Sequence, residues 1–171
     1  NTGSMTAGAD GTTIDGMSDE RIQRIIESMR DKSYLPKPAR REYIAKKNSN
    51  KKRPLGIQSG NDKLVQEVVK MILESIYEPV FKKTSHGFRP NKSCQTALYQ
   101  IQKTFTGTNW FVEGDIKACF DSFDHAVLIC ILRKRIEDEA FLNLICKFLK
   151  ARYMEQWTFN KTYFGIPQGS G

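Results

Sequence analysis

The chain has 171 residues, of which 39% are hydrophobic and 27% are charged, and it can bury a core of the size found in one ordinary domain. No apolar run approaches the roughly 20 residues of a membrane-spanning helix, and the N-terminus lacks the basic and apolar regions of a signal peptide. These two features lead us to expect a cytoplasmic protein without a membrane partner. A formal net charge of +8 favours a polyanionic partner.

The first 30 residues predict a loop followed by a helix. Residues 1–18 contain four glycines and little that could pack, which is typical of a loop. Ser18 fits the N-cap of a helix, and the acidic pair Asp19 and Glu20 suits its positive N-terminal end. Apolar residues then recur at the helical spacing i, i+3, i+4 and i+7, at Ile22, Ile25, Ile26 and Met29. We expect one amphipathic helix that ends before Pro36.

Residues 41–57 predict a β-hairpin that turns at Asn48–Asn50. Most of the net charge lies here, because the segment 37–53 holds eight basic residues and the single acid Glu42, a net of +7. The basic residues are Lys37, Arg40, Arg41, Lys46, Lys47, Lys51, Lys52 and Arg53. The hairpin therefore carries a local positive field, although a basic run is more commonly a solvated charged loop.

Four further helices and a second hairpin are expected. Asn61 or Asp62 can cap a long helix with a wide apolar stripe that ends before Pro79. Ser93 can cap the next helix, which Gly107 ends. Helices are then expected at about 124–136 and 138–150, followed by an aromatic-rich hairpin at 154–166. This mixed order of helices and hairpins predicts an α+β fold.

The stretch WFVEGDI, residues 110–116, predicts a short strand with Phe111, Glu113 and Asp115 on one face. An aspartate at a strand end can bind a hard divalent cation such as Mg²⁺. For an isolated aspartate the commoner role is to cap the following turn, a role open to Asp115 and to Asp121. The carboxylate thus becomes a specific signal only together with other motifs.

The four cysteines are Cys94, Cys119, Cys130 and Cys146. They are far apart in the sequence and form neither a C-x-x-C pair nor a Cys/His cluster at zinc-site spacing. We therefore expect them to be buried free thiols.

Six blocks follow one another along the chain: TAGADGTTIDG, KKRPLGI, DKLVQEVVKMILESIYEPVF, SHGFRPNKSCQTAL, FVEGDIKACFDSFDH and GIPQGSG. In order and spacing they closely resemble the reverse-transcriptase domain of bacterial group II intron-encoded proteins, the maturase reverse transcriptases. The resemblance extends from about Thr6 to Gly169. It implies a right-hand polymerase fold of which this chain supplies only the fingers and part of the palm. Residues 1–107 would be mainly fingers, and 108–171 a partial palm truncated after PQG.

The resemblance also implies roles for individual residues. Asp115 resembles the first catalytic, metal-binding aspartate, and the Ile116 carbonyl could add a metal contact. The residues implied to bind the nucleotide are Lys46, Arg53, Phe120 and Gln168, with Lys47 an alternative to Lys46 because the turn is one residue longer than is common. Those implied to contact nucleic acid are Arg40, Arg41, Lys47, Lys51, Lys52 and Arg89. Three of these residues have a structural alternative. Phe120 could pack in the core, Gln168 could occupy a turn, and Arg89 could form hydrogen bonds within its own loop.

The implied parent enzyme copies RNA into DNA by nucleotidyl transfer with two Mg²⁺ ions and also acts in intron splicing. Its partners would be structured intron RNA, an RNA template with a DNA primer, and deoxynucleoside triphosphates, and a homodimer stays open. Relatives carry their remaining catalytic aspartates in a Tyr-Ala-Asp-Asp block after PQG, so this fragment is expected to be inactive and to bind Mg²⁺ weakly or not at all.

Two other function classes stay open at this point. A noncatalytic RNA-binding module could dock the basic hairpin on structured intron RNA. An unrelated Mg²⁺-dependent phosphodiesterase built around Asp115 would need a second acidic cluster close to that residue in space.

Overall fold

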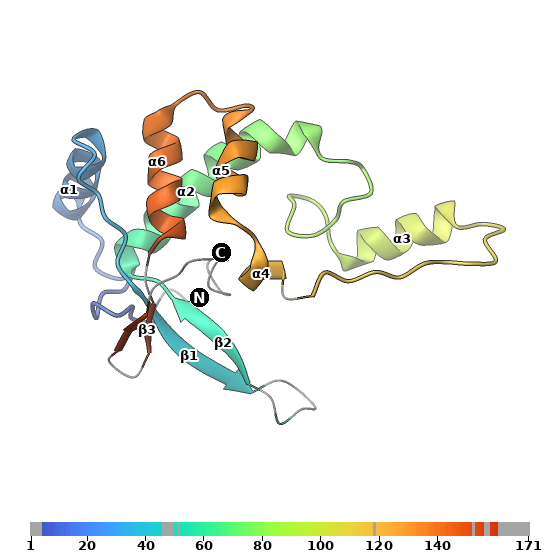
Figure 1. The fold of residues 1–171 in the computed structure, drawn as a ribbon, viewed down its shortest axis with the longest axis horizontal. Coiled ribbons are helices and arrows are strands. Elements are labelled where there is room, and N and C mark those ends of the chain that lie inside the picture. Colours follow the sequence, from blue (N-terminus) through green and yellow to red (C-terminus); the bar gives the residue numbers. More distant parts are fainter. Residues whose placement is uncertain are drawn as a thin grey trace. The chain divides into compact units, whose positions relative to one another are not determined.

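The computed structural model describes residues 5–45, 50, 52–117, 119–151, 153–155 and 158–160 (Figure 1). In chain order the elements are α1 (Asp19–Arg30), β1 (Ala39–Ala45), β2 (Lys52–Ile57), α2 (Gly60–Tyr77), the 3₁₀ turn η1 (Glu78–Val80), α3 (Cys94–Thr104), α4 (Cys119–Ser122), α5 (His125–Arg133), α6 (Glu139–Leu149), β3 (Tyr153–Glu155) and β4 (Thr158–Asn160). The predicted α+β class is confirmed, as are the helices around α1, α2, α3, α5 and α6. The two predicted hairpins correspond to the antiparallel pairs β1–β2 and β3–β4, and residues 48–49 of the first predicted turn and 156–157 and 161–166 of the second predicted hairpin lie outside the described residues. Among the described helices, none combines the length and the apolarity needed to cross a bilayer.

The strands form one sheet in the order β2-β1-β3-β4. β1 and β2 pair antiparallel, from Arg40 opposite Ile57 to Ala45 opposite Lys52. β1 also pairs in parallel with β3, at Ala39 opposite Tyr153. This second pairing joins segments more than 100 residues apart in the chain, and it brings the two predicted hairpins into the same sheet.

The chain divides into two compact units. The first comprises residues 1–69 and 118–171, and it contains the sheet, α1, α5, α6 and the first half of α2. Its core is built on Ile25, Tyr34 and Val65, against which Met29, Leu64, Val69, Leu144 and Phe148 pack. The second unit, residues 70–117, contains the rest of α2, η1, α3 and the connecting loops.

Polar side chains start the helices where the sequence pattern predicts them for α1 and α3. The Ser18 hydroxyl accepts the Arg21 N–H at 3.3 Å, and Ser93 forms a capping box with Thr96. The prediction that Asn61 or Asp62 caps α2 is wrong. α2 begins at Gly60, and its cap is Ser59, whose hydroxyl accepts the Asp62 N–H at 3.2 Å.

Asp62 is instead a buried hydrogen-bond acceptor, with 1% of its surface exposed. Its Oδ1 accepts the Tyr34 hydroxyl at 2.6 Å, while Oδ2 accepts the Lys37 N–H at 2.9 Å and the Ser59 hydroxyl at 2.8 Å. Burial raises the pKa of the Asp62 carboxyl, and these three hydrogen bonds act in the opposite direction. One side chain thereby fixes the segment that leads into β1 to the start of α2.

The N-terminal loop packs against the same helix start, contrary to the expectation that it packs little. The Gly60 N–H donates to the Thr12 hydroxyl at 3.1 Å, and the Lys63 ammonium donates to the Thr6 carbonyl at 2.8 Å. A Cβ added at Gly60 would lie 2.1 Å from the Thr13 carbonyl oxygen, and one added at Gly8 would lie 2.6 Å from the Ser59 Cα. The loop can lie this close because neither glycine carries a side chain.

The predicted strand at 110–116 is wrong, since these residues form no strand. Trp110 and Val112 expose 89% and 99% of their surface, and Ile116 exposes 72%. A strand requires a hydrogen-bonding neighbour, and no strand of the described sheet pairs with this segment. Asp115 therefore lies on an exposed segment of the second unit.

The four cysteines are free thiols, as predicted, but they are not buried. Cys94, Cys119 and Cys130 are exposed and Cys146 is half-buried. Cys130 illustrates the reason, because it lies about 200° around α5 from the buried Leu132. The wide spacing of the cysteines in the sequence argued against a zinc-binding motif, but it did not show which face of a helix each thiol occupies.

Replacing Asp62 with asparagine tests the role of the buried carboxylate. The amide NH₂ would face a hydrogen-bond donor in place of an acceptor oxygen, so Asp62→Asn should lower the free energy of unfolding by about 1–3 kcal/mol. Urea denaturation followed by circular dichroism measures this difference. The exposed Asp15, changed to asparagine, is the matched control and should stay within about 0.5 kcal/mol of the wild type. Equal stability of both variants would contradict the role given to Asp62.

Candidate functional site

The structure describes only part of the predicted site. Arg40 and Arg41 lie on β1, Lys52 begins β2, and Arg89, Asp115 and Ile116 lie in loops of the second unit. Arg53 on β2 and Phe120 on α4 are described by their backbone alone. The predicted residues Lys46, Lys47, Lys51 and Gln168 lie outside the described residues.

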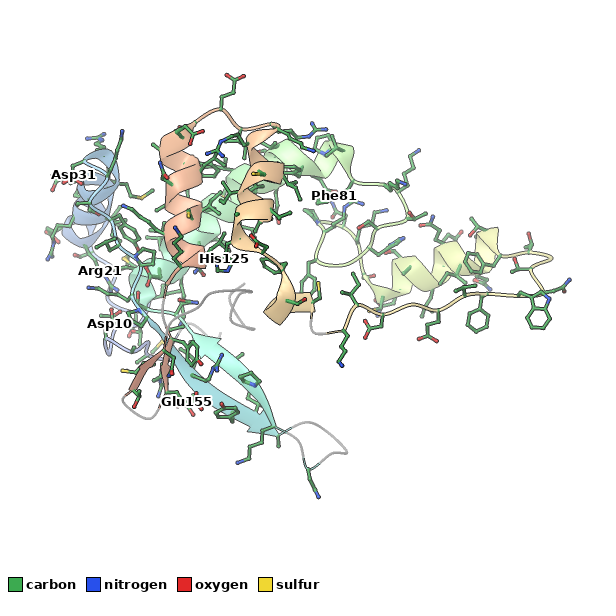
Figure 2. All side chains as sticks on the ribbon, in the orientation of Figure 1. Asp10, Arg21, Asp31, Phe81, His125 and Glu155 are labelled. Atoms are coloured by element: carbon green, nitrogen blue, oxygen red, sulfur yellow. The ribbon has the colours of Figure 1, made fainter. Side chains whose placement is uncertain are left out.

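Arg41 has a structural role within the sheet. Its guanidinium lies 3.6 Å from the centroid of the Tyr153 ring, and its Nη1 is 3.8 Å from Glu155 Oε2. The Tyr43 hydroxyl donates to the other oxygen of Glu155 at 2.6 Å, and this hydrogen bond raises the pKa of Tyr43. Glu155, the last residue of β3, is labelled in Figure 2. Arg41 and Tyr43 thus brace β1 against β3, and a contact of Arg41 with nucleic acid stays a prediction.

Arg40 and Lys52 are nearer to solvent. Arg40 Nη1 is 3.1 Å from Glu42 Oε1, in an ion pair whose side chains are 37% and 52% exposed. Such a surface pair contributes little to stability, and its arginine can exchange the carboxylate for a phosphate at low energetic cost. Lys52 is exposed opposite Ala45, at the end of the paired region. Among the hairpin side chains that the structure describes, the accessible positive charge is therefore at Arg40 and Lys52.

Asp115 is exposed on the segment 108–117, beside the equally exposed Ile116 and two residues from Glu113. Its carboxylate and the Ile116 carbonyl offer the hard oxygen ligands that Mg²⁺ prefers. Within the described ranges, however, no group of three or more His, Cys, Asp and Glu residues could hold a metal ion. Asp115 alone is a partial ligand set and does not constitute a magnesium site, and the second acidic cluster that a phosphodiesterase centre would need is not found among those residues.

Arg89 is the best-connected side chain of the second unit. Its Nε donates to both carboxylate oxygens of Glu78 at 3.2 and 3.1 Å, and Nη2 donates to Glu78 Oε1 at 2.8 Å. Nη1 donates to the carbonyls of Lys82 and Ser85, both at 2.8 Å. The arginine holds the pKa of the Glu78 carboxyl below its usual value. Of the two roles considered for Arg89, hydrogen bonding within its own loop is confirmed, and contact with nucleic acid stays a prediction.

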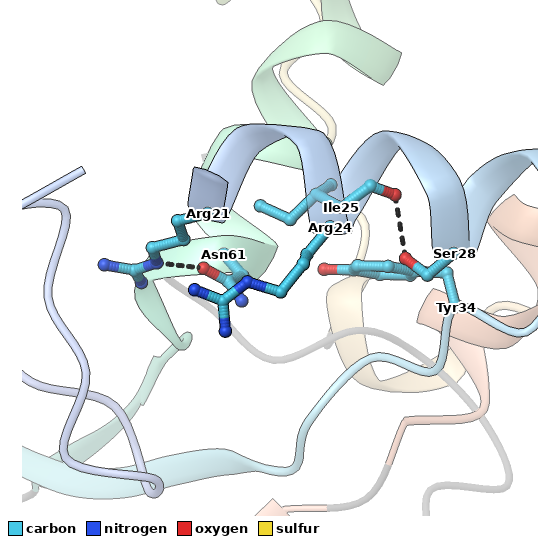
Figure 3. A pocket seen from close by; sticks show the side chains of 6 residues that line it. All are labelled: Arg21, Arg24, Ile25, Ser28, Tyr34 and Asn61. Atoms are coloured by element: carbon cyan, nitrogen blue, oxygen red, sulfur yellow. Dashed lines mark hydrogen bonds between the residues drawn. The ribbon is translucent and has the colours of Figure 1, made fainter. Parts of the chain in front are cut away.

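The chain also has a pocket that the sequence patterns did not predict (Figure 3). It has a volume of about 180 Å³ and is lined by Arg21, Arg24, Ile25, Ser28, Tyr34 and Asn61. Arg21 Nε donates to Asn61 Oδ1 at 2.6 Å, and Arg24 Nε donates to the Glu20 carbonyl at 3.2 Å. The i, i+3 spacing of the two arginines on α1 was the available sequence signal. Arg21 thereby joins α1 to the start of α2, whereas the hydrogen bond of Arg24 stays within α1.

A solved structure shares the fold. The Partial Cas6-RT-Cas1--Cas2 complex contains a chain that matches 94% of this one with a TM-score of 0.58 and 22% sequence identity, over 28% of its own length. This likeness confirms the predicted polymerase fold and, at that identity, shows the fold alone.

The sequence comparisons give the family. The model of the family described as "Reverse transcriptase (RNA-dependent DNA polymerase)" matches residues 44–171. The chain therefore belongs to the reverse transcriptase family.

The chain is also similar to proteins encoded in introns. The "Group II intron-encoded protein LtrA" of Lactococcus lactis subsp. cremoris is 57% identical over 99% of this chain and 28% of its own length. The "Uncharacterized 91 kDa protein in cob intron" of Schizosaccharomyces pombe is 48% identical over 99% of this chain and 21% of its own length. The predicted resemblance to group II intron-encoded reverse transcriptases is confirmed. The chain spans less than a third of the length of either relative.

Replacing Arg89 with lysine keeps the charge and tests whether the several hydrogen bonds of the guanidinium order the loop at 82–92. Lysine cannot reproduce several charge-assisted bonds at once, so Arg89→Lys should speed amide hydrogen exchange at residues 82–92 by about tenfold or more. Lys83→Arg, which also keeps the charge, should leave exchange in this segment unchanged. Hydrogen-exchange mass spectrometry measures both variants. Wild-type protection in Arg89→Lys would show that the loop is ordered by other contacts.

Proposed function

We propose that the whole protein is an RNA-directed DNA polymerase that also acts in intron splicing, and that this chain supplies its fingers, mainly residues 1–107, and part of its palm, residues 108–171. The observation that carries the proposal is the family match across residues 44–171, a range that contains Asp115. The similarity to intron-encoded relatives supports the splicing role.

In this proposal Asp115 is the carboxylate that the chain contributes to metal binding. Its exposure on the segment 108–117 leaves it accessible to an ion and to a primer end. Mg²⁺ gives up its water reluctantly, and one exposed carboxylate offers little compensation. The 171-residue chain should therefore bind Mg²⁺ weakly, with the remaining ligands supplied by other parts of the whole protein.

The proposed partners are structured intron RNA and an RNA template paired with a DNA primer. The basic hairpin is the proposed contact with their phosphates, together with the exposed lysines Lys82 and Lys83 of the second unit. For Lys46, Arg53, Phe120 and Gln168 we propose contacts with the incoming deoxynucleoside triphosphate, on the basis of their positions within the family's motifs. A noncatalytic RNA-binding module would use the same hairpin, so primer extension is the assay that separates the two functions.

A substitution of Asp115 in the whole protein tests the proposed catalytic role of this carboxylate. Asp115→Asn nearly preserves shape but removes the charge that would hold a cation, and should lower primer extension on an RNA template by roughly 100-fold or more. Glu113→Gln, on the same exposed segment, is the matched control and should keep wild-type activity. Near-normal synthesis by Asp115→Asn would contradict the proposal. Equal loss in both variants would instead indicate a site built on the two carboxylates together.

The hairpin's contact with RNA can be tested on the 171-residue chain. Each neutralised phosphate contributes roughly 0.7–0.9 to the slope of log K against log salt concentration, so reversing Lys51, Lys52 and Arg53 to glutamate should flatten this slope by about 2. The control reverses Lys134, Arg135 and Lys150, three exposed cations near the ends of α5 and α6, with the same change in net charge. Filter binding across a salt series measures both. Similar slopes for the two triple variants would remove the hairpin from the interface.

A further inference from the structure

Phe88 has an unusual backbone conformation and an unusually exposed ring. Its φ is +53°, in the left-handed region that a bulky side chain rarely adopts, and its relative exposure is 102%. Within the described residues the ring therefore adds nothing to a core. Because no packing among the described residues offsets the strain, a functional reason is the better explanation for this conformation.

The loop that carries Phe88 is held in place on both sides. The adjacent Arg89 binds Glu78 and two loop carbonyls, and its guanidinium lies 5.1 Å from the centroid of the Phe81 ring, which Figure 2 labels. His86 is hydrogen-bonded through its two ring nitrogens to Thr96 at 2.8 Å and to Gln100 at 2.6 Å, both on α3. The exposed ring is thus presented by an ordered loop, so little conformational entropy is lost when a ligand binds it.

The charges of the loop that carries Phe88 favour a polyanion. The segment 82–92 contains Lys82, Lys83, Arg89 and Lys92 and no acidic residue. The nearest acid on η1, Glu78, is paired with Arg89. An exposed aromatic ring among cations is the combination with which proteins bind single-stranded nucleic acid, since the ring stacks on a base and the cations contact its phosphates.

We propose that Phe88 is a stacking platform for an unpaired base of a single-stranded nucleic acid, and that Lys82 and Lys83 contact the flanking phosphates. The inference rests on the proposed nucleic-acid function and adds a subsite to it. Stacking on a phenyl ring tolerates any base, so this subsite should select for unpaired strands and against duplexes, without selecting a sequence.

Fluorescence anisotropy with a labelled 12-nucleotide oligouridine RNA, the matching oligothymidine DNA and an RNA duplex tests the proposal. Phe88→Ala and Phe88→Leu should raise the Kd for both single strands by about fivefold or more, which corresponds to the lower end of the effect per stacked base. Phe88→Tyr and Phe88→Trp should keep wild-type affinity. Duplex affinity and the salt slope should not change in any of these variants, because the ring carries no charge. Loss of affinity for only one of the two single strands would identify that strand as the ligand.

Two further variants keep folding and binding apart. Leu98→Ala removes another exposed apolar side chain of the same unit, 66% exposed on α3, and should bind like the wild type. Phe88→Gly removes the ring and also relieves the positive φ, so its melting temperature should equal or exceed that of the wild type while single-strand affinity is lost.

Three outcomes would overturn the subsite. The first is wild-type affinity in Phe88→Ala, and the second is equal affinity of Phe88→Leu and Phe88→Tyr. The third is a lower melting temperature of Phe88→Gly with unchanged binding, and this result would make Phe88 a packing residue. Failure of the wild-type chain to bind any of the three oligonucleotides at low salt would instead contradict the proposed contact of this chain with nucleic acid.

Discussion

The buried carboxylate of Asp62 is the interaction on which the first unit depends. Ionised or protonated, an acidic group without hydrogen bonds would be costly to bury, and Asp62 receives them from Tyr34, Lys37 and Ser59. Those residues come from the end of the α1 region, from the approach to β1 and from the start of α2. Tyr34 is also part of the core with Ile25 and Val65. One side chain and its three hydrogen-bond donors therefore hold the segment between α1 and β1 against the start of α2.

Charge has two separate uses in this chain. Arg41 and Arg89 both come from motifs expected to contact nucleic acid, yet each binds a glutamate of its own unit and lies against an aromatic ring. The planar guanidinium suits this bracing, because it can stack and donate several hydrogen bonds at once. Lys52, Lys82 and Lys83 are left exposed beside the braced segments. The two arginines order the hairpin and the loop at 82–92, and the exposed lysines give these two segments their positive charge.

Local features of the fold could be predicted from the sequence, and non-local features could not. Ser18, Ser93 and the hairpin around β1 and β2 depend on residues a few positions apart, so their signals are contained in short windows. The pairing of β1 with β3 and the burial of Asp62 depend on distant segments, which no local pattern reveals. The expected strand around Asp115 failed for the same reason, since alternation of side chains does not supply a hydrogen-bonding neighbour.

The candidate site, too, could be predicted from the sequence only in part. The order of motifs led to the family and to Asp115, whereas composition and spacing alone would have left that aspartate as a turn residue. The sequence left the role of Arg89 undecided, and only its contacts with Glu78, Lys82 and Ser85 settled that it orders its own loop. Phe88 carried no signal in the sequence, because a positive φ on a bulky residue is visible only in the structure.

The central claim is that this chain binds nucleic acid through the basic hairpin and through the loop at 82–92, and not through α1 or α6. Photocrosslinking of a 4-thiouridine-substituted single-stranded RNA to the chain, followed by mass spectrometry of the crosslinked peptides, tests it most directly. The account predicts crosslinks within residues 36–57 and 82–92. Crosslinks confined to α1 and α6, with none in those two segments, would contradict it.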